Sequence, residues 1–227
     1  MIEQSFRLIP FPAPHIPAIS LTGKCSLHDN YLDLHYSLAG NIEEILLPPP
    51  SPSPSRKDEL WKETCFELFL AIKGQPGYWE FNLAPCGDWN VYRMDAYRRT
   101  GFREETAISQ LHFEFKRESD ACSLDVSVDL ASLIYPQQEL QMAITAIIQT
   151  MAGIETYWAL THPAPYADFH LREGFILGLA GQTHPSEQPA PDGLSSSTPD
   201  RLPPPHPIPL RKEDSQVVGS PGSIYSA

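Results

Sequence analysis

Apolar and polar residues alternate with a period of two in segment after segment of this 227-residue chain. In residues 65–72, for example, Phe66, Leu68 and Leu70 occupy every second position. Successive side chains of a strand point to opposite faces of a sheet, so this period is typical of β-strands with one buried face. Residues 78–83 repeat the pattern, and we predict a strand over each segment. The alternation limits the fold strongly, because an amphipathic helix needs a period of about 3.6.

The same pattern, or a short apolar run, recurs along the first 180 residues. Further strands are predicted at residues 4–11, 20–28, 31–38, 89–94, 111–116, 122–129, 140–150, 156–160 and 174–179. One short helical turn is expected at residues 130–134, where Asp129 can cap it. Many short strands separated by turn residues predict an all-β fold, an antiparallel β-sandwich of jelly-roll or immunoglobulin-like type.

The composition divides the chain into one domain and a tail. We assign residues 1–181 to the β-sandwich, with a Pro/Ser-rich loop at residues 47–58 that either lies near a ligand face or is a tolerated insertion. Residues 182–227 are rich in proline and serine without periodicity, which predicts a disordered tail. Its PPPHPIPLRK segment could offer a polyproline helix to a protein partner, or remain solvated without one.

The charge balance argues against several partners. The chain has 16 Lys and Arg against 28 Asp and Glu, a formal net charge of −12. This excess of negative charge opposes binding to nucleic acid or to anionic lipid. We find no apolar run of membrane-spanning or signal-peptide length, which predicts a cytoplasmic protein that does not enter a membrane.

Polar residues with binding chemistry gather in the stretch from residue 60 to residue 102. Glu67 and Glu80 point away from the more apolar faces of their predicted strands, as does Asn82, while Trp89 and Arg93 share one face of the next strand. Aromatic planes cover the C–H faces of sugars, and carboxylates, amides and guanidinium groups bond sugar hydroxyls. The alternative is that the Trp residues of this stretch pack in the core of the sandwich.

Four segments carry a family resemblance: LWKETCFELFL, YWEFNLAPCGDWNVYRMDAYR, TYWALTHP and ADFHLREGFIL. Together they resemble the DOMON-like superfamily, in the branch near the family 9 carbohydrate-binding modules, over roughly residues 4–181. The resemblance implies a β-sandwich that binds a sugar or, in other branches, a b-type haem. It also implies that Trp61 and Trp158 stack on the sugar while Glu67 and Arg93 bond its hydroxyls.

The segment from His162 to His170 has three interpretations. His162, Asp168 and His170 have a spacing that allows a loop to bring two imidazoles and a carboxylate to one metal ion. The family resemblance implies a second possibility, a haem held by one of the two histidines opposite Met94. In the third interpretation, these side chains tie a Pro-containing loop to the sheet by hydrogen bonds.

The leading hypothesis is a non-catalytic carbohydrate-binding module without a cofactor. It would recognise a sugar or sugar derivative through the six residues Trp61, Glu67, Asn82, Trp89, Arg93 and Trp158. One alternative is a haem- or metal-binding domain in redox chemistry or sensing. The other is a glycoside hydrolase that uses Glu67 and Glu80 as its carboxylate pair, although the chain carries no GxSxG, P-loop, GxGxxG or zincin motif.

Overall fold

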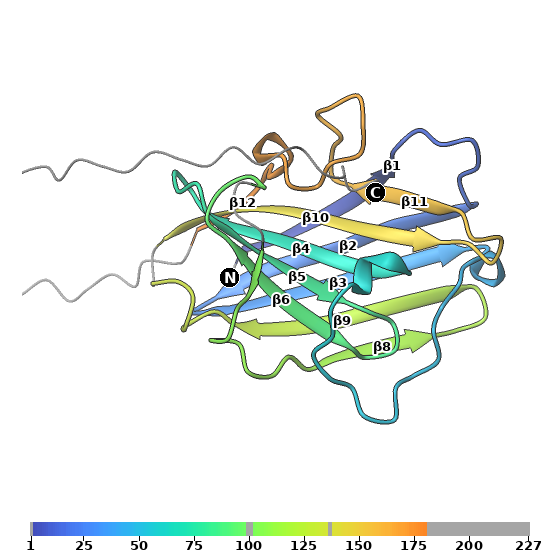
Figure 1. Ribbon diagram of the computed structural model, residues 1–227, viewed down its shortest axis with the longest axis horizontal. Helices are drawn as coiled ribbons and strands as arrows, with labels where there is room; N and C mark the ends of the chain where they lie inside the picture. Colours follow the sequence, from blue (N-terminus) through green and yellow to red (C-terminus); the bar gives the residue numbers. More distant parts are fainter. Residues whose placement is uncertain (1, 99–101, 136–137, 181–227) are drawn as a thin grey trace, which may run out of the picture. The chain divides into compact units, whose positions relative to one another are not determined.

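A computed structural model describes residues 2–98, 102–135 and 138–180 and shows an antiparallel all-β fold, which confirms the predicted fold class (Figure 1). The strands are β1 (Ile2–Pro10), β2 (Ile19–His28), β3 (Tyr31–Gly40), β4 (Cys65–Ile72), β5 (Tyr78–Leu83), β6 (Trp89–Met94), β7 (Arg103–Glu104), β8 (Phe113–Arg117), β9 (Ala121–Asp129), β10 (Glu139–Gln149), β11 (Glu155–Ala159) and β12 (Leu177–Ala180). Three short 3₁₀ helices are η1 (Ile42–Glu44), η2 (Leu60–Lys62) and η3 (Arg172–Gly174). None of the helices in these residues has the length and apolar character needed to span a membrane.

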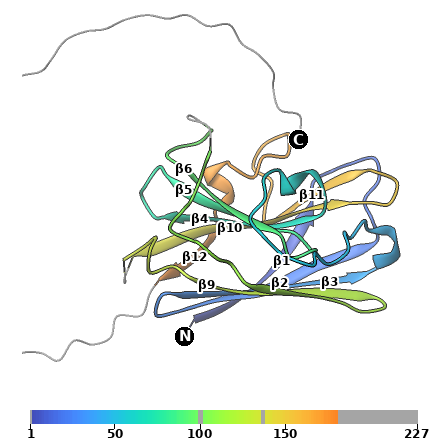
Figure 2. The same ribbon diagram turned by 60° about the horizontal axis from the view of Figure 1, so that its bottom comes forward.

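The strands form two layers, which we call sheet A and sheet B (Figure 2). Sheet A has the order β1-β2-β3-β9-β8, and sheet B has the order β7-β6-β5-β4-β10-β11, with β12 also paired to β10. Strand β1 belongs to both layers, because its first part pairs with β2 while Ile9 and Pro10 pair with β11. The chain therefore passes from one layer to the other within a single strand.

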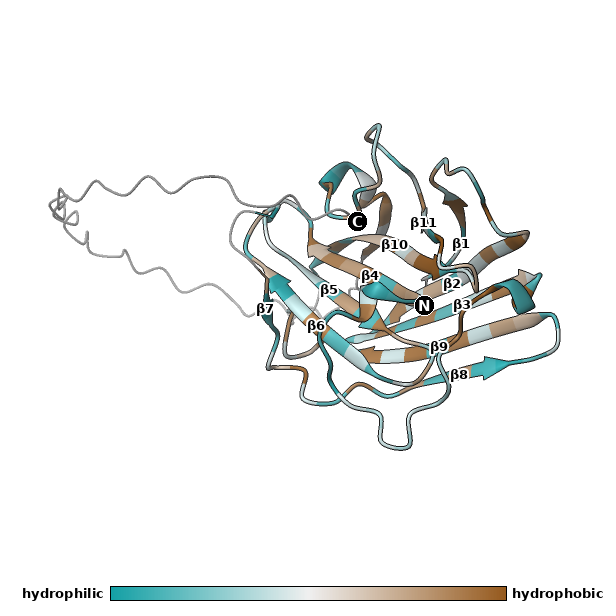
Figure 3. Ribbon diagram, turned by 45° about the vertical axis from the view of Figure 1, so that its right-hand side comes forward, coloured by the Kyte–Doolittle hydropathy of each residue, from teal (hydrophilic) through white to brown (hydrophobic). Residues whose placement is uncertain are grey.

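The core lies between the inner faces of the two sheets. Because every second residue of a strand points to the same face, the apolar residues of each strand point inward. Apolar and polar residues alternate along the strands (Figure 3). Tyr36 of sheet A packs against Phe66 of sheet B with ring centroids 5.0 Å apart, and its hydroxyl donates to the backbone oxygen of Glu67 at 2.6 Å. Each fully buried apolar side chain contributes about 1.5–3 kcal/mol, so these contacts between layers hold the sandwich together.

Three of the four tryptophans are core residues. Trp79, Trp89 and Trp158 are at most 6 % exposed and belong to the apolar cluster between the sheets. The indole N–H of Trp158 donates to Oγ1 of Thr156 at 2.9 Å, which satisfies its only polar atom. For these three residues the structure supports packing in the core, the alternative to a ligand-stacking surface.

The Pro/Ser-rich loop at residues 47–58 runs beside β6. It contains no helix or strand, apart from a single bridge between Arg56 and Trp89. The Arg56 guanidinium lies 4.4 Å from the centroid of the Trp89 ring and donates to Oδ1 of Asn90 at 2.6 Å. Lys57 adds an ion pair with Asp88 at 2.6 Å, so the end of the loop is anchored to the sheet.

Two further predictions concern the turn after β9 and the C-terminal tail. The helical turn after Asp129 is present, since the carboxylate accepts from the Ala131 amide at 2.9 Å and Ile134 N donates to Leu130 O at 2.9 Å. The predicted disordered tail, residues 182–227, lies outside the described residues.

Candidate functional site

A row of four polar side chains crosses the outer face of sheet B. Asn90 of β6 lies opposite Asn82 of β5, Asn82 opposite Glu67 of β4, and Glu67 opposite Thr145 of β10. Neighbouring strands are about 4.8 Å apart, so the four side chains stand abreast. We call these residues the polar row. All four are at most 2 % exposed, which is unusual for polar groups on the outer face of a sandwich.

Aromatic rings cover the polar row from two sides. Trp61, on η2, lies 5.8 Å from the ring of Tyr92 on β6. Phe169 comes from the segment between β11 and β12, orange in Figure 2, and lies 6.1 Å from the ring of Tyr157 on β11. Because β5, β4 and β10 lie between β6 and β11, the two rings flank the polar row, and both are only partly buried.

The hydrogen bonds of the polar row leave one acceptor open. Glu67 accepts from the Thr145 hydroxyl at 3.1 Å, and Glu80, two residues before Asn82 on β5, accepts from the Asn82 amide nitrogen at 2.8 Å. The other amide atom, Oδ1 of Asn82, is buried and receives no hydrogen bond from any described residue. An acceptor buried in this way costs about 1–3 kcal/mol, so it is a natural position for a ligand donor.

The two carboxyl groups hold protons more tightly than usual. Burial raises the pKa of Glu67 well above its ordinary value, and the neighbouring Glu80 charge raises it further. Burial raises the pKa of Glu80 to about 7, although the Asn82 hydrogen bond and the charge of Arg98 act in the opposite direction. Near neutral pH the pair therefore retains a proton and can both donate and accept.

His170 and Tyr78 adjoin this pair. The Tyr78 hydroxyl and Nδ1 of His170 are 2.9 Å apart, and Nε2 of His170 is 4.0 Å from Oε2 of Glu80. Burial lowers the pKa of His170 to about 4, with the Arg98 charge acting in the same direction. The ring is therefore neutral at physiological pH and supplies no positive charge to the two carboxyl groups.

Asp168 fixes the covering segment in place. Its carboxylate accepts from the Tyr97 hydroxyl at 2.7 Å, from the His170 amide at 3.0 Å and from Arg98 at 3.1 Å. Burial opposes the charged form, but these hydrogen bonds and the Arg98 charge outweigh it and lower the pKa of Asp168. The carboxylate thus links the loop after β6 to the segment that carries Phe169.

The six residues predicted as a binding site are divided between two faces. Trp61, Glu67 and Asn82 lie together on the outer face of sheet B. Trp89 and Trp158 lie in the core, and Arg93 lies on the Trp89 side of β6, where its guanidinium is 5.7 Å from the Trp79 ring centroid. The structure does not bring these three residues to the polar row, because positions 89, 91 and 93 point to the opposite face from 90 and 92.

Of the residues considered for metal or haem, Asp168 and His170 lie together, whereas His162 has other contacts. His162 contacts Phe11 with ring centroids 5.2 Å apart, and its Nε2 is 2.9 Å from the backbone oxygen of Ile9. Asp168 and His170 make the contacts described above, while Met94 is buried in an apolar cluster that includes Tyr78. Among residues 2–98, 102–135 and 138–180, no three His, Cys, Asp or Glu side chains are grouped to hold a metal ion.

Several site residues were not predicted from the sequence. Thr145 could have been recognised from the sequence, since it is the polar residue in the middle of the apolar run from Met142 to Ile148. Tyr78 also had a signal in the sequence, since alternation along β5 places it on the same face as Glu80 and Asn82. Phe169 had none, because its position depends on how the segment after β11 folds back over the sheet.

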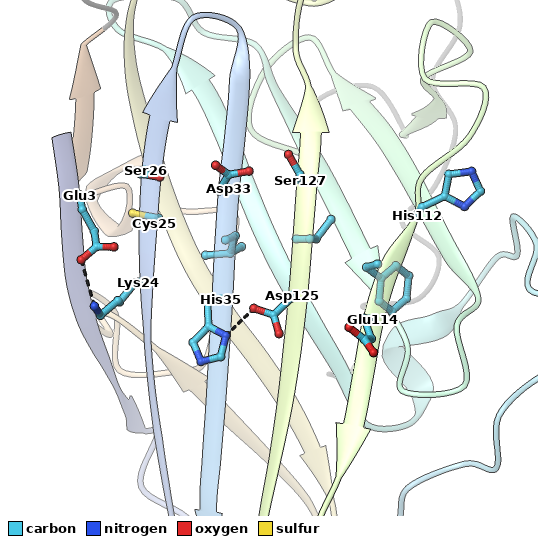
Figure 4. A pocket seen from close by; sticks show the side chains of 13 residues that line it. Glu3, Lys24, Cys25, Ser26, Asp33, His35, His112, Glu114, Asp125 and Ser127 are labelled. Carbon is cyan, nitrogen blue, oxygen red and sulfur yellow. Dashed lines mark hydrogen bonds and ion pairs between the residues drawn. The ribbon is translucent and has the colours of Figure 1, made fainter. Parts of the chain in front are cut away.

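The outer face of sheet A offers a different surface. A shallow groove of about 560 Å³ crosses β1, β2, β3, β9 and β8 (Figure 4). Its charged side chains are paired, His35 with Asp125 at 2.6 Å and Lys24 with Glu3 at 3.0 Å, and each is at least 40 % exposed. The groove is thus lined by solvated ion pairs.

Comparison with known proteins gives matches in structure alone. No family model matches this sequence, and no curated protein is significantly similar to it. Among solved structures, a candidate carbohydrate-binding protein from Bacteroides uniformis is similar with a TM-score of 0.61 and 10 % identity, over 79 % of this chain and 85 % of that one. A family 9 carbohydrate-binding module from Caldicellulosiruptor kristjanssonii, in complex with cellotriose, has a TM-score of 0.51 and 11 % identity over 82 % and 88 %. The chain therefore has a fold like that of family 9 carbohydrate-binding modules.

Proposed function

We propose that this protein binds carbohydrate without chemical change, at the polar row on the outer face of sheet B. The shared fold supports the proposal, because one similar structure is a carbohydrate-binding module in complex with cellotriose. The sequence resemblance to the DOMON-like superfamily points in the same direction through its branch near the family 9 modules.

One observation carries the proposal: Oδ1 of Asn82 is a buried acceptor that no described residue satisfies. It lies in a row with Glu67, between the partly exposed rings of Trp61 and Phe169. A sugar hydroxyl that donated to Oδ1 would remove an energetic cost of about 1–3 kcal/mol. The flanking rings would cover the C–H faces of the sugar.

A binding measurement on single variants tests this site. Calorimetric titration with mono- and oligosaccharides should give saturable binding, and Trp61→Ala should weaken it about tenfold or more, since a stacked ring is lost. Tyr31→Ala is a matched control, because Tyr31 is a 45 % exposed aromatic residue at the start of β3, a central strand of sheet A. Equal affinity of wild type and Trp61→Ala would show that the sugar binds elsewhere.

A glycoside hydrolase is the second candidate, and the carboxylate pair favours it. Glu67 and Glu80 lie on adjacent strands, and a pKa of about 7 would keep Glu80 partly protonated, as a general acid requires. Release of nitrophenol from aryl glycosides by the wild type, abolished by Glu67→Gln, would establish this activity. Binding without release would leave the non-catalytic function.

A further inference from the structure

Hydrogen-bond acceptors outnumber donors at the polar row. Glu67, Glu80 and Oδ1 of Asn82 supply acceptors, while the Thr145 hydroxyl and the Asn82 amide nitrogen already donate to the two carboxylates. The fourth member, Asn90, is fully used by the anchored loop, since its amide nitrogen donates to Lys57 O at 3.0 Å and its Oδ1 accepts from Arg56. A ligand that satisfies the open acceptor, Oδ1 of Asn82, must therefore bring a donor.

Among the described residues, the carboxyl pair also has no ion pair with Lys or Arg. Within the described residues, the closest basic nitrogen recorded for either group is Nε2 of His170, 4.0 Å from Glu80. Arg98 is bonded to Asp168 at 3.1 Å, and Lys57 is paired with Asp88 at 2.6 Å. Buried carboxylates are normally paired with a positive group, so the missing charge is a property that the ligand can supply.

We propose that the sugar bound at this site is an amino sugar with a free ammonium group, which sits between Glu67, Glu80 and Oδ1 of Asn82. This inference rests on the proposed function and specifies its ligand class. An ammonium group carries three N–H donors, one for each of the three acceptors, whereas a hydroxyl has one. Hydrogen bonds with an ionised partner are about twice as strong as neutral ones.

Binding of the ammonium releases a proton from the carboxyl pair. A positive charge beside Glu67 and Glu80 favours their ionised forms, so a proton that one of them holds moves to the solvent. The titratable groups that face the pair, which are Arg98, His170, Tyr78 and Tyr92, keep their protonation states. A neutral sugar would cause no such release, which gives a second readout besides affinity.

The test is calorimetric titration near pH 7 with three matched pairs: glucosamine and glucose, galactosamine and galactose, mannosamine and mannose. We expect an amino sugar to bind about tenfold or more tightly than its neutral counterpart. For the amino sugar alone, the measured heat of binding should vary with the ionisation enthalpy of the buffer, because the buffer takes up the released proton. N-acetylglucosamine, which has no charge, should lose the advantage.

Isosteric variants link this preference to the carboxyl pair. Glu67→Gln and Glu80→Gln should each remove most of the preference, whereas Glu114→Gln, an exposed carboxylate on sheet A, should retain it. Circular dichroism establishes that each variant is folded, and Glu80→Gln suffices if Glu67→Gln does not fold.

The outcomes separate the inference from the function on which it rests. If neutral sugars bind as tightly as amino sugars, the amino-sugar inference is wrong and the proposed function stands. If neither the amino nor the neutral sugars bind, both are wrong. An increase of the melting temperature by calcium ions that is lost in Glu67→Gln and Glu80→Gln would also overturn the inference. The positive charge at this site would then come from a metal ion and not from an amino sugar.

Discussion

The two outer faces of the sandwich carry the same kinds of residues in different states. On sheet A, the carboxylates of Asp125 and Glu114 are 50 % and 63 % exposed, and each has a basic partner within 3 Å. On sheet B, Glu67 and Glu80 are 2 % and 6 % exposed and have no Lys or Arg partner among the described ion pairs. Both faces arise from the same alternation of apolar and polar residues along a strand.

Burial by distant segments makes the difference. Trp61 before β4 and the segment after β11 fold over sheet B, whereas sheet A has no such cover among the described residues. An exposed ion pair contributes about 0–1 kcal/mol to stability and stays charged. A carboxyl group that is buried by a cover instead has a shifted pKa and still requires hydrogen-bond partners. The predictions below test this contrast, beginning with the largest effect.

Loss of the packing between sheet B and the segment that covers it should cost the most stability. Phe69 is 1 % exposed on the outer face of sheet B and contacts Phe169, Phe175 and His170. We expect Phe69→Ala to lower the free energy of unfolding by about 3–5 kcal/mol, because it leaves a cavity in an aromatic cluster. Urea unfolding measures this, with Ser127→Ala on sheet A as the control. A loss below about 1 kcal/mol would mean that the cover contributes little.

Glu80 should make stability depend on pH. Its folded pKa of about 7 lies above the ordinary carboxyl value, so the folded state binds the proton more tightly. This contribution is complete at acidic pH and is lost as the pH rises through 7. Glu80→Gln lacks that loss, so the stability of the variant relative to wild type should rise between pH 5 and pH 8, by on the order of 1–3 kcal/mol.

Thermal unfolding at the two pH values measures this change. Glu114→Gln, which removes an exposed carboxylate of sheet A, is the matched control. A parallel pH dependence of wild type and Glu80→Gln would contradict a buried, proton-binding Glu80.

The strands could be predicted from the sequence, but the composition of the site could be predicted only in part. Strands β4, β5 and β6 have the predicted limits, since alternation defines where a strand begins and ends. The faces of β6 were not defined, because Trp89 and Val91 on one side are as apolar as Tyr92 and Met94 on the other. Phe169 was beyond reach, because only the folded chain brings it beside a strand about 100 residues earlier.

The smallest effect should come from His170, and its sign is opposite to that of Glu80. Burial lowers its folded pKa to about 4, below the ordinary imidazole value, so the folded state favours the neutral ring. This contribution is complete above the ordinary value and is lost as the pH falls from about 6.5 to 4. His170→Gln should therefore gain stability relative to wild type on acidification, by about 1 kcal/mol, since the side chain is 22 % exposed.

Unfolding of wild type and His170→Gln at pH 4.5 and pH 7 measures the gain. Ser127→Ala, at an exposed position of sheet A that carries no titratable group, is the control. As the pH rises from 4.5 to 6.5, the stabilising contributions of Glu67 and Glu80 decrease while that of His170 increases, so the wild-type profile mixes opposing effects. The contrast between the two faces is therefore visible only when each group is removed separately, and a His170→Gln profile parallel to that of the wild type would mean that His170 is not held neutral by the cover.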